Sequence, residues 1–172
     1  MKLRKLLFVH VLVLVGVCFL LVPTSVTAHG RFFKIQYAAK FVCGLKSDSD
    51  INRVLRGAYA TAINIHNPKN ESIVLNLRLA LTFPPEGLQP GEVSAPIEVE
   101  LGPNQALEID CAEIPDSFFE NPPQTTYTKG FVIIESPKSL DVTAVYTSGP
   151  TPQTNVSFAV ERIQGRNIRV SY

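Results

Sequence analysis

Two histidines, His29 and His66, are the residues of this sequence best suited to bind a metal. If the chain is cut after Ala28, His29 becomes the first residue and offers its α-amino nitrogen and a ring nitrogen to one metal ion. A ring nitrogen of His66 would complete a set of three nitrogen ligands, and a planar nitrogen set suits copper(II). The sequence therefore allows a copper site built from His29 and His66, in the arrangement called a histidine brace.

The His29-Gly30 start resembles that of secreted lytic polysaccharide monooxygenases, and some periplasmic copper carriers also use a histidine brace. The resemblance implies a copper-binding protein or a copper oxygenase with an axial aromatic side chain nearby, for which Tyr146 and Phe158 are the candidates. Against it, His66 stands directly before Asn67-Pro68, where a side chain commonly caps a turn. We therefore expect no cofactor, and we keep copper as the alternative.

Two of the three cysteines, Cys43 and Cys111, remain if the first 28 residues are removed. Two cysteines in an oxidising compartment suggest one disulfide, which would stabilise the fold by roughly 4 kcal/mol in the chain-entropy model. One alternative is a pair of buried free thiols. Another is a thiolate and imidazole metal site with His66, although the cysteines lack the close pairing that makes a zinc signal strong.

A group of acidic residues in the second half of the chain could hold calcium or supply paired carboxylates for acid and base chemistry. Their spacing matches no calcium loop. Glu108 and Asp110 would share the solvated face of a strand, since alternate side chains point to the same side. We therefore expect a solvated face and nominate no catalytic residue. The members are Glu108, Asp110, Glu113, Asp116 and Glu120.

The N-terminus has the three parts of a secretory signal peptide. Three basic residues lie among the first five, residues 6–22 form an apolar run, and residues 23–28 supply a small-residue exit. We expect residues 1–28 to be a signal peptide and the protein to be secreted or periplasmic. An uncleaved membrane anchor is the alternative, because the apolar run has about the minimum length for spanning a bilayer. A lipoprotein at Cys18 is disfavoured, because Val17 stands where a small residue should precede it.

The charge balance argues against a nucleic-acid partner. Removal of residues 1–28 takes away three basic residues and leaves 13 Lys and Arg against 15 Asp and Glu, a net charge of −2. These charges are scattered along the chain, whereas a nucleic-acid binder shows a basic stripe. We expect a protein or cell-envelope partner, no nucleic acid, and contact with a membrane only if the N-terminal segment is uncleaved.

The rest of the chain, residues 29–172, alternates between strand patterns and turn residues. Residues 71–83 show period-two alternation from Ile73 to Phe83, which is typical of a half-buried strand. Pro96 suggests an edge strand or a bulge within residues 92–101, and a helical turn is expected at residues 115–119. About eight strands predict one all-β domain, an Ig-like antiparallel β-sandwich with Greek-key connections. Further strands are expected at residues 32–43, 58–67, 105–111, 129–136, 140–148 and 155–163, with a short last piece at residues 167–172.

Several of these strands resemble an uncharacterised group of small secreted bacterial β-domain proteins. The resemblance implies a secreted β-domain and no particular reaction, and the strand pattern alone also resembles the sandwich of sensory rhodopsin transducer proteins. We therefore expect a secreted or periplasmic, non-catalytic binding or structural module, with the copper protein as the alternative. The strings that carry the first resemblance are YAAKFVCG, YATAINIHNP, QALEIDC, KGFVIIES and LDVTAVYT.

Overall fold

The computed structural model describes residues 32–47, 54–82, 89–118, 127–150 and 155–170. All of them belong to one compact unit, Arg31–Tyr172. Within these ranges the chain forms nine strands and one short helix, so the predicted all-β antiparallel fold is confirmed. His29 lies outside the described residues, as does the whole of the predicted signal peptide.

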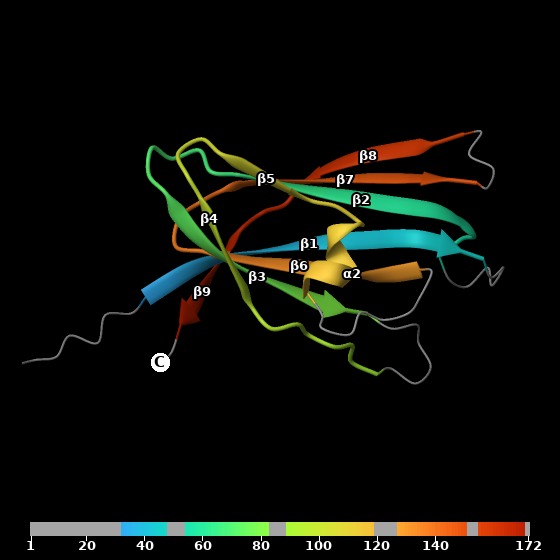
Figure 1. Cartoon of the computed structure of the whole chain (residues 1–172), viewed down its shortest axis with the longest axis horizontal. Helices are drawn as coiled ribbons and strands as arrows, with labels where there is room; N and C mark the ends of the chain where they lie inside the picture. The colour runs from blue at the N-terminus through green and yellow to red at the C-terminus, as the bar shows by residue number, and fades with distance from the viewer. Residues whose placement is uncertain (1–31, 48–53, 83–88, 119–126, 151–154, 171–172) are drawn as a thin grey trace, which may run out of the picture. The chain divides into compact units, whose positions relative to one another are not determined.

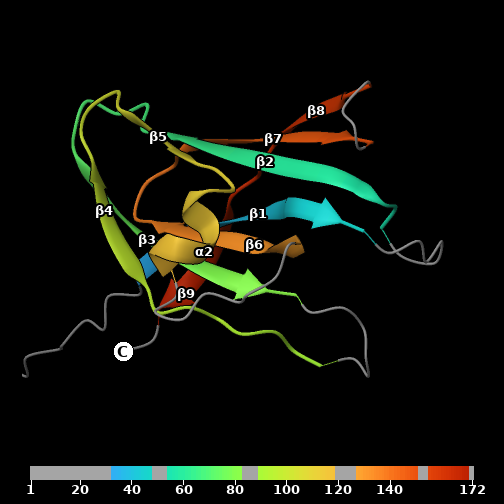
Figure 2. The ribbon, with the colours of Figure 1, turned by 45° about the vertical axis from the view of Figure 1, so that its right-hand side comes forward.

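The nine strands form one antiparallel sheet that folds over into two layers. The order is β4-β3-β6-β1-β2-β7-β8, with β5 also beside β2 and β9 also beside β1. Figures 1 and 2 show β5, β2, β7 and β8 in one layer, which we call the upper layer, above β1, β6 and β3 in the lower layer. The strands are β1 (Phe32–Lys46), β2 (Gly57–His66), β3 (Ile73–Leu81), β4 (Ile97–Leu101), β5 (Ala106–Ile109), β6 (Tyr127–Ser136), β7 (Asp141–Gly149), β8 (Ser157–Arg162) and β9 (Arg166–Val170).

The core between the layers is built from alternate residues of the central strands. On β3 every second side chain from Ile73 to Leu81 is buried, as the alternation predicts. Ile63 and Ile65 of β2 and Val142 of β7 are buried on the upper layer. Each such side chain contributes about 1.5–3 kcal/mol when fully removed from water, which is why the strands adopt this register.

The long strand β1 connects the two layers. It pairs with β6 from Ile35 to Gly44 and with β2 only at its end, from Gly44 to Lys46. Gly44 has a φ of 98°, a conformation that favours glycine. The buried positions change from odd to even numbers between Cys43 and Lys46, so the strand has a bulge at Gly44 that lets it turn from one layer to the other.

Residues 92–101 form a shorter strand than the alternation predicts. Only Ile97–Leu101 is strand, while Val93 and Ala95 are exposed and Ser94 is buried instead. The hydroxyl of Ser94 accepts a hydrogen bond from the Leu79 N–H at 2.9 Å. The side chains that face the core therefore change from even-numbered to odd-numbered residues across Pro96. Strand β4 is a terminal strand of the sheet. The prediction of one regular strand is wrong, whereas the bulge and the edge position suggested by Pro96 are confirmed.

Candidate functional site

His66 lies at the end of β2 and contacts an acidic side chain. Its Nδ1 is 3.4 Å from Asp141 Oδ2, and Asp141 Oδ1 is 3.4 Å from the Nη2 of Arg162. These three side chains form an exposed polar group at one end of the upper layer. The pairing of His66 with His29 stays a prediction. In the part of the chain that the structure describes, no three His, Cys, Asp or Glu side chains are grouped closely enough to hold a metal.

The axial candidates for the copper site lie far from His66. In the register of β2 and β7, His66 is opposite Asp141, whereas Tyr146 is opposite Thr61. Five residues along a strand correspond to about 17 Å, so Tyr146 is too distant to complete a site at His66. Phe158 pairs with Thr147, which lies one residue beyond Tyr146. The expectation that Tyr146 or Phe158 stands near His66 is therefore wrong, because the strand register separates them.

Asn67, rather than His66, organises the turn after β2. Its side chain is fully buried and its Nδ2 donates to the carbonyls of Glu71 at 2.8 Å, Gly102 at 2.9 Å and Leu101 at 3.1 Å. Its Oδ1 accepts from the N–H of Lys69 at 3.0 Å. The Asn67 side chain thus joins the β2–β3 turn to the β4–β5 turn.

Cys43 and Cys111 form the expected disulfide. The two sulfurs are 2.05 Å apart, and the bridge joins β1 to the segment that follows β5. The alternatives of two free thiols and of a thiolate metal site with His66 are wrong, because both sulfurs are used by the bridge. A disulfide of this kind suggests an oxidising, extracellular environment.

Two of the acidic residues, Asp110 and Glu113, cap a short helix. Helix α2 (Glu113–Phe118) follows Asp110, whose Oδ1 accepts from the N–H of Ala112 at 2.6 Å. The Glu113 carboxylate accepts from the N–H of Asp110 at 3.0 Å, which completes a capping box. The hydrogen bond from Ala112 is the largest cause of a lowered pKa of the Asp110 carboxyl. Asp116 has no described side chain, and Glu120 lies outside the described residues.

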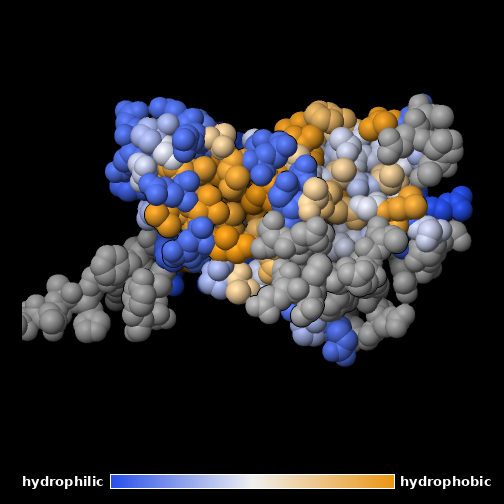
Figure 3. Space-filling model, viewed as in Figure 1, coloured by the Kyte–Doolittle hydropathy of each residue, from blue (hydrophilic) through white to orange (hydrophobic). Residues whose placement is uncertain are grey.

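The most open surface of the described chain is β8, at the end of the strand order. All six of its residues are exposed, which means that neither face of the strand is covered. Val156, just before it, is 62% exposed, and Phe158 and Val160 are 67% and 59% exposed. Figure 3 shows hydrophobic surface along the line of β8 at the upper right. Large apolar side chains gathered on an open strand are typical of an interaction site.

The same face continues across β7 and β2 in two cross-strand rows. Ala62, Val145 and Val160 form one row, and Ala60, Thr147 and Phe158 form the other. We call these six residues the β8 face. A shallow depression of about 330 Å³ adjoins it, and its lining includes four of these residues together with Glu108 and Asp110. A smaller depression of about 110 Å³ is lined by Ala60, Thr147 and Val156 among others. None of these six side chains of the β8 face is charged, and the carboxylates of Glu108 and Asp110 stand beside them. The six residues are suited to contact with apolar groups.

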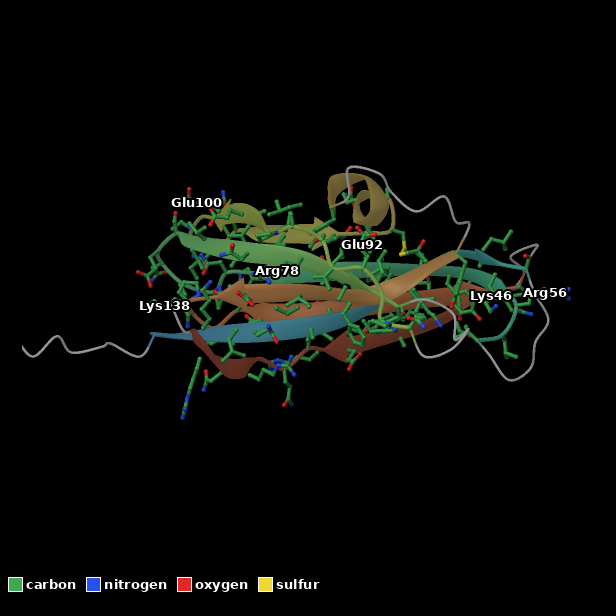
Figure 4. All side chains as sticks on the ribbon, turned by 90° about the horizontal axis from the view of Figure 1, so that it is seen from below. Lys46, Arg56, Arg78, Glu92, Glu100 and Lys138 are labelled. Carbon is green, nitrogen blue, oxygen red and sulfur yellow. A yellow bond between two sulfur atoms is a disulfide. The ribbon has the colours of Figure 1, made fainter. Side chains whose placement is uncertain are left out.

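A larger depression lies at the β1–β2 connection. It measures about 480 Å³ and is lined partly by Lys46 and Arg56, which Figure 4 shows at the same end of the molecule. Its lining stops at Ser47 and Pro150, each of which borders residues that the structure does not describe. We therefore assign no site to it.

The sequence predicts β8 as a strand but not as the exposed one. Alternation places Val156, Phe158 and Val160 on one side of residues 155–163, but it cannot say whether a second layer covers that side. Phe158 and Val160 belong to the terminal strand β8, and Val156 directly precedes it. All three side chains are therefore exposed to solvent.

Comparison with known proteins gives little further information. The chain matches no protein-family model and no curated protein. One solved structure, described as the crystal structure of Thermotoga maritima 1070, aligns with 78% of this chain and 95% of its own. The identity is 10% and the TM-score is 0.45, a likeness too weak to support an inference about function.

Proposed function

We propose that this chain is a secreted or periplasmic, non-catalytic binding module that holds an apolar segment of a protein partner on the β8 face. The observation that carries the proposal is the set of six uncharged side chains in two rows, with Phe158 exposed at one edge. Aromatic side chains are among those that most often contribute strongly to the binding energy of an interface.

Burial on a partner would give this face a favourable free energy. Complete burial of a side chain such as that of Phe158 or Val160 contributes about 1.5–3 kcal/mol. The small residues Ala60, Ala62 and Thr147 leave shallow depressions beside them, into which apolar side chains of a partner can pack. A partner with alternating apolar residues fits the two parallel rows, because each row consists of uncharged side chains.

The proposed location is supported by the N-terminal pattern and the disulfide. Residues 1–28 carry the basic, apolar and small-residue parts of a signal peptide. The bridge between Cys43 and Cys111 suits an oxidising compartment. In the described ranges no helix has the length and apolar character needed to cross a membrane, and the apolar run at residues 6–22 lies outside those ranges.

Peptide selection tests the proposed function. Random linear peptides displayed on phage are selected on the full chain, and the affinity of the best peptide is measured for the wild type and for two substituted proteins. Val145→Lys changes the β8 face on β7, whereas Val74→Lys is the matched control on β3, where Val74 is 48% exposed. We expect peptides rich in alternating apolar residues, and at least tenfold weaker binding to the Val145→Lys protein only.

Two results would contradict the proposed function. Selection that yields no peptide above background would show that the face has no affinity for apolar segments. Equal loss of affinity in the Val74→Lys protein would show that binding takes place elsewhere or is unspecific. No observation in the described residues favours copper, so a histidine brace of His29 and His66 stays a prediction of the sequence.

A further inference from the structure

We propose that β8 of one chain pairs antiparallel with β8 of a second copy, about a two-fold axis that passes beside Ala159. The result is a dimer in which the two sheets continue into each other. This inference concerns the free edge of β8 and the pairs that its side chains make across that edge, whereas the proposed function concerns the exposed surface of the β8 face. Neither depends on the other.

Among the described strands, only β7 pairs with β8, so the second edge of β8 has no strand beside it there. A terminal strand presents a row of unpaired N–H and C=O groups that bind a further strand unless the edge is protected. Proline and lysine, which commonly protect such edges, are both absent from the sequence Ser157–Arg162. The other terminal strand, β4, follows Pro96 and a bulge and points Glu98 and Glu100 outward. The edge of β4 is therefore better protected than that of β8, whose charged residues Glu161 and Arg162 stand together at one end of the strand.

One antiparallel register of two copies of Ser157–Arg162 pairs the large apolar residues with each other twice. With Ala159 opposite Ala159 of the second copy, Phe158 stands opposite Val160 of that copy, and this apolar pair occurs twice. Aromatic and β-branched side chains placed opposite each other on antiparallel strands stabilise the pairing by about 0.2–1 kcal/mol relative to alanine. The Phe158 and Val160 side chains of both copies are exposed in the single chain, so each pair removes apolar surface from water.

The charges of β8 favour the same register. Glu161 would lie opposite Ser157 of the second copy, with the two Glu161 residues about 14 Å apart along the strands. A register centred on Val160 would bring the two Glu161 residues to about 7 Å and would place Phe158 opposite Arg162. Compared with an axis beside Val160, the axis beside Ala159 therefore gives more apolar pairs and less repulsion between the two Glu161 side chains.

The dimer would leave both faces of the joined sheet open. A two-fold axis perpendicular to the sheet keeps equivalent side chains on the same side, so the β8 faces of the two copies would lie next to each other. A partner with a long or repeated apolar segment could then contact both. Closed two-fold pairing also satisfies both free edges at once, which leaves no further edge for a third copy.

Charged substitutions of Ala159, at the two-fold axis, test the proposal. Ala159→Glu and Ala159→Lys each place two like charges opposite each other, and analytical ultracentrifugation measures the mass of each protein alone and of their mixture. We expect a dimeric wild type, at least tenfold weaker association of each substituted protein, and a dimer in the mixture. Ala38→Glu and Ala38→Lys are the matched controls, because Ala38 is equally an exposed alanine but lies on β1 within the sheet.

A monomeric wild type at all concentrations would overturn the proposal, and so would a mixture that fails to associate.

A single introduced cysteine tests the register. Ala159→Cys should form an intermolecular disulfide in the dimer, and Glu161→Cys should not. If both cross-link equally, the pairing at Ala159 is wrong. The Val145→Lys protein separates the two proposals: it should stay dimeric while losing peptide binding, and its mass and its peptide affinity are measured independently.

Discussion

At the scale of single residues, the buried Asn67 shows how a polar side chain can determine the position of two turns. Its amide contacts four backbone groups from the β2–β3 and β4–β5 connections. A buried carbonyl that loses its donor costs roughly 1–3 kcal/mol, so these contacts matter more than their number suggests. The sequence places Asn67 in a turn because of Asn67-Pro68, but it does not show that the turn packs against residues 101 and 102.

Replacement of Asn67 tests this role. We expect Asn67→Ala to lower the free energy of unfolding by about 3 kcal/mol, because three carbonyls lose a donor and the N–H of Lys69 loses an acceptor. Asn67→Asp should be at least as damaging at neutral pH, since a carboxylate would face carbonyl oxygens. Denaturant unfolding measures both. Asn70→Ala, at an exposed position of the same turn, is the control, and a similar loss there would contradict the role of Asn67.

The phenol of Tyr146 gives a prediction about pH. Burial first, and then the hydrogen bond from its hydroxyl to Glu161 Oε2 at 3.0 Å, raise the pKa of Tyr146 to about 12. In the unfolded chain the pKa of a tyrosine is about 10. Between these two values the unfolded state has released the proton and the folded state has kept it. The stability contributed by Tyr146 is therefore complete below pH 10 and is lost as the pH rises to about 12.

Absorbance of tyrosinate measures this shift. The difference between the wild type and a Tyr146→Phe protein should give one phenol that titrates near pH 12, and Glu161→Gln should move that titration to lower pH because it removes a nearby negative charge. A phenol that titrates near its ordinary pKa of about 10 in the wild type would contradict the account.

At the scale of strands and helices, alternation predicts the strands that pack in the centre of the fold. The strands β2, β3, β6 and β7 all lie within or close to their predicted ranges, because one side of each faces the core. The pattern fails at residues 92–101, where Ser94 rather than an apolar residue turns inward to bond with Leu79. The hydrogen bond from the backbone N–H of Leu79 to the hydroxyl of Ser94 turns Ser94 inward. The pattern of apolar residues contains no information about such a bond.

The disulfide gives a prediction about how the layers are held together. Cys43 is on β1 and Cys111 follows β5, 68 positions later in the sequence. Removing a bridge that closes so long a loop should lower the free energy of unfolding by roughly 4 kcal/mol, since the unfolded chain gains freedom. The test is denaturant unfolding of a Cys43→Ala and Cys111→Ala double variant. An unchanged unfolding midpoint would contradict a stabilising role for the bridge.

At the scale of the whole molecule, one end of the sheet is better protected than the other. The sequence predicts the all-β fold, the disulfide and most strands, because these follow from local alternation and from the number of cysteines. It does not predict the β8 face, which depends on the strand order. That order is a property of the complete chain, and it places β8 at the end of the sheet.

The most direct test of an interaction surface at β8 is site-specific photo-crosslinking in the cells that produce the protein. A benzophenone side chain is placed at Phe158 in one protein and at Phe131 in a second, since Phe131 is also an exposed phenylalanine but lies on β6. We predict discrete cross-linked products of defined mass from position 158 and none from position 131. Products from both positions, or from neither, would contradict the claim that this molecule makes its contacts through the β8 side of its sheet.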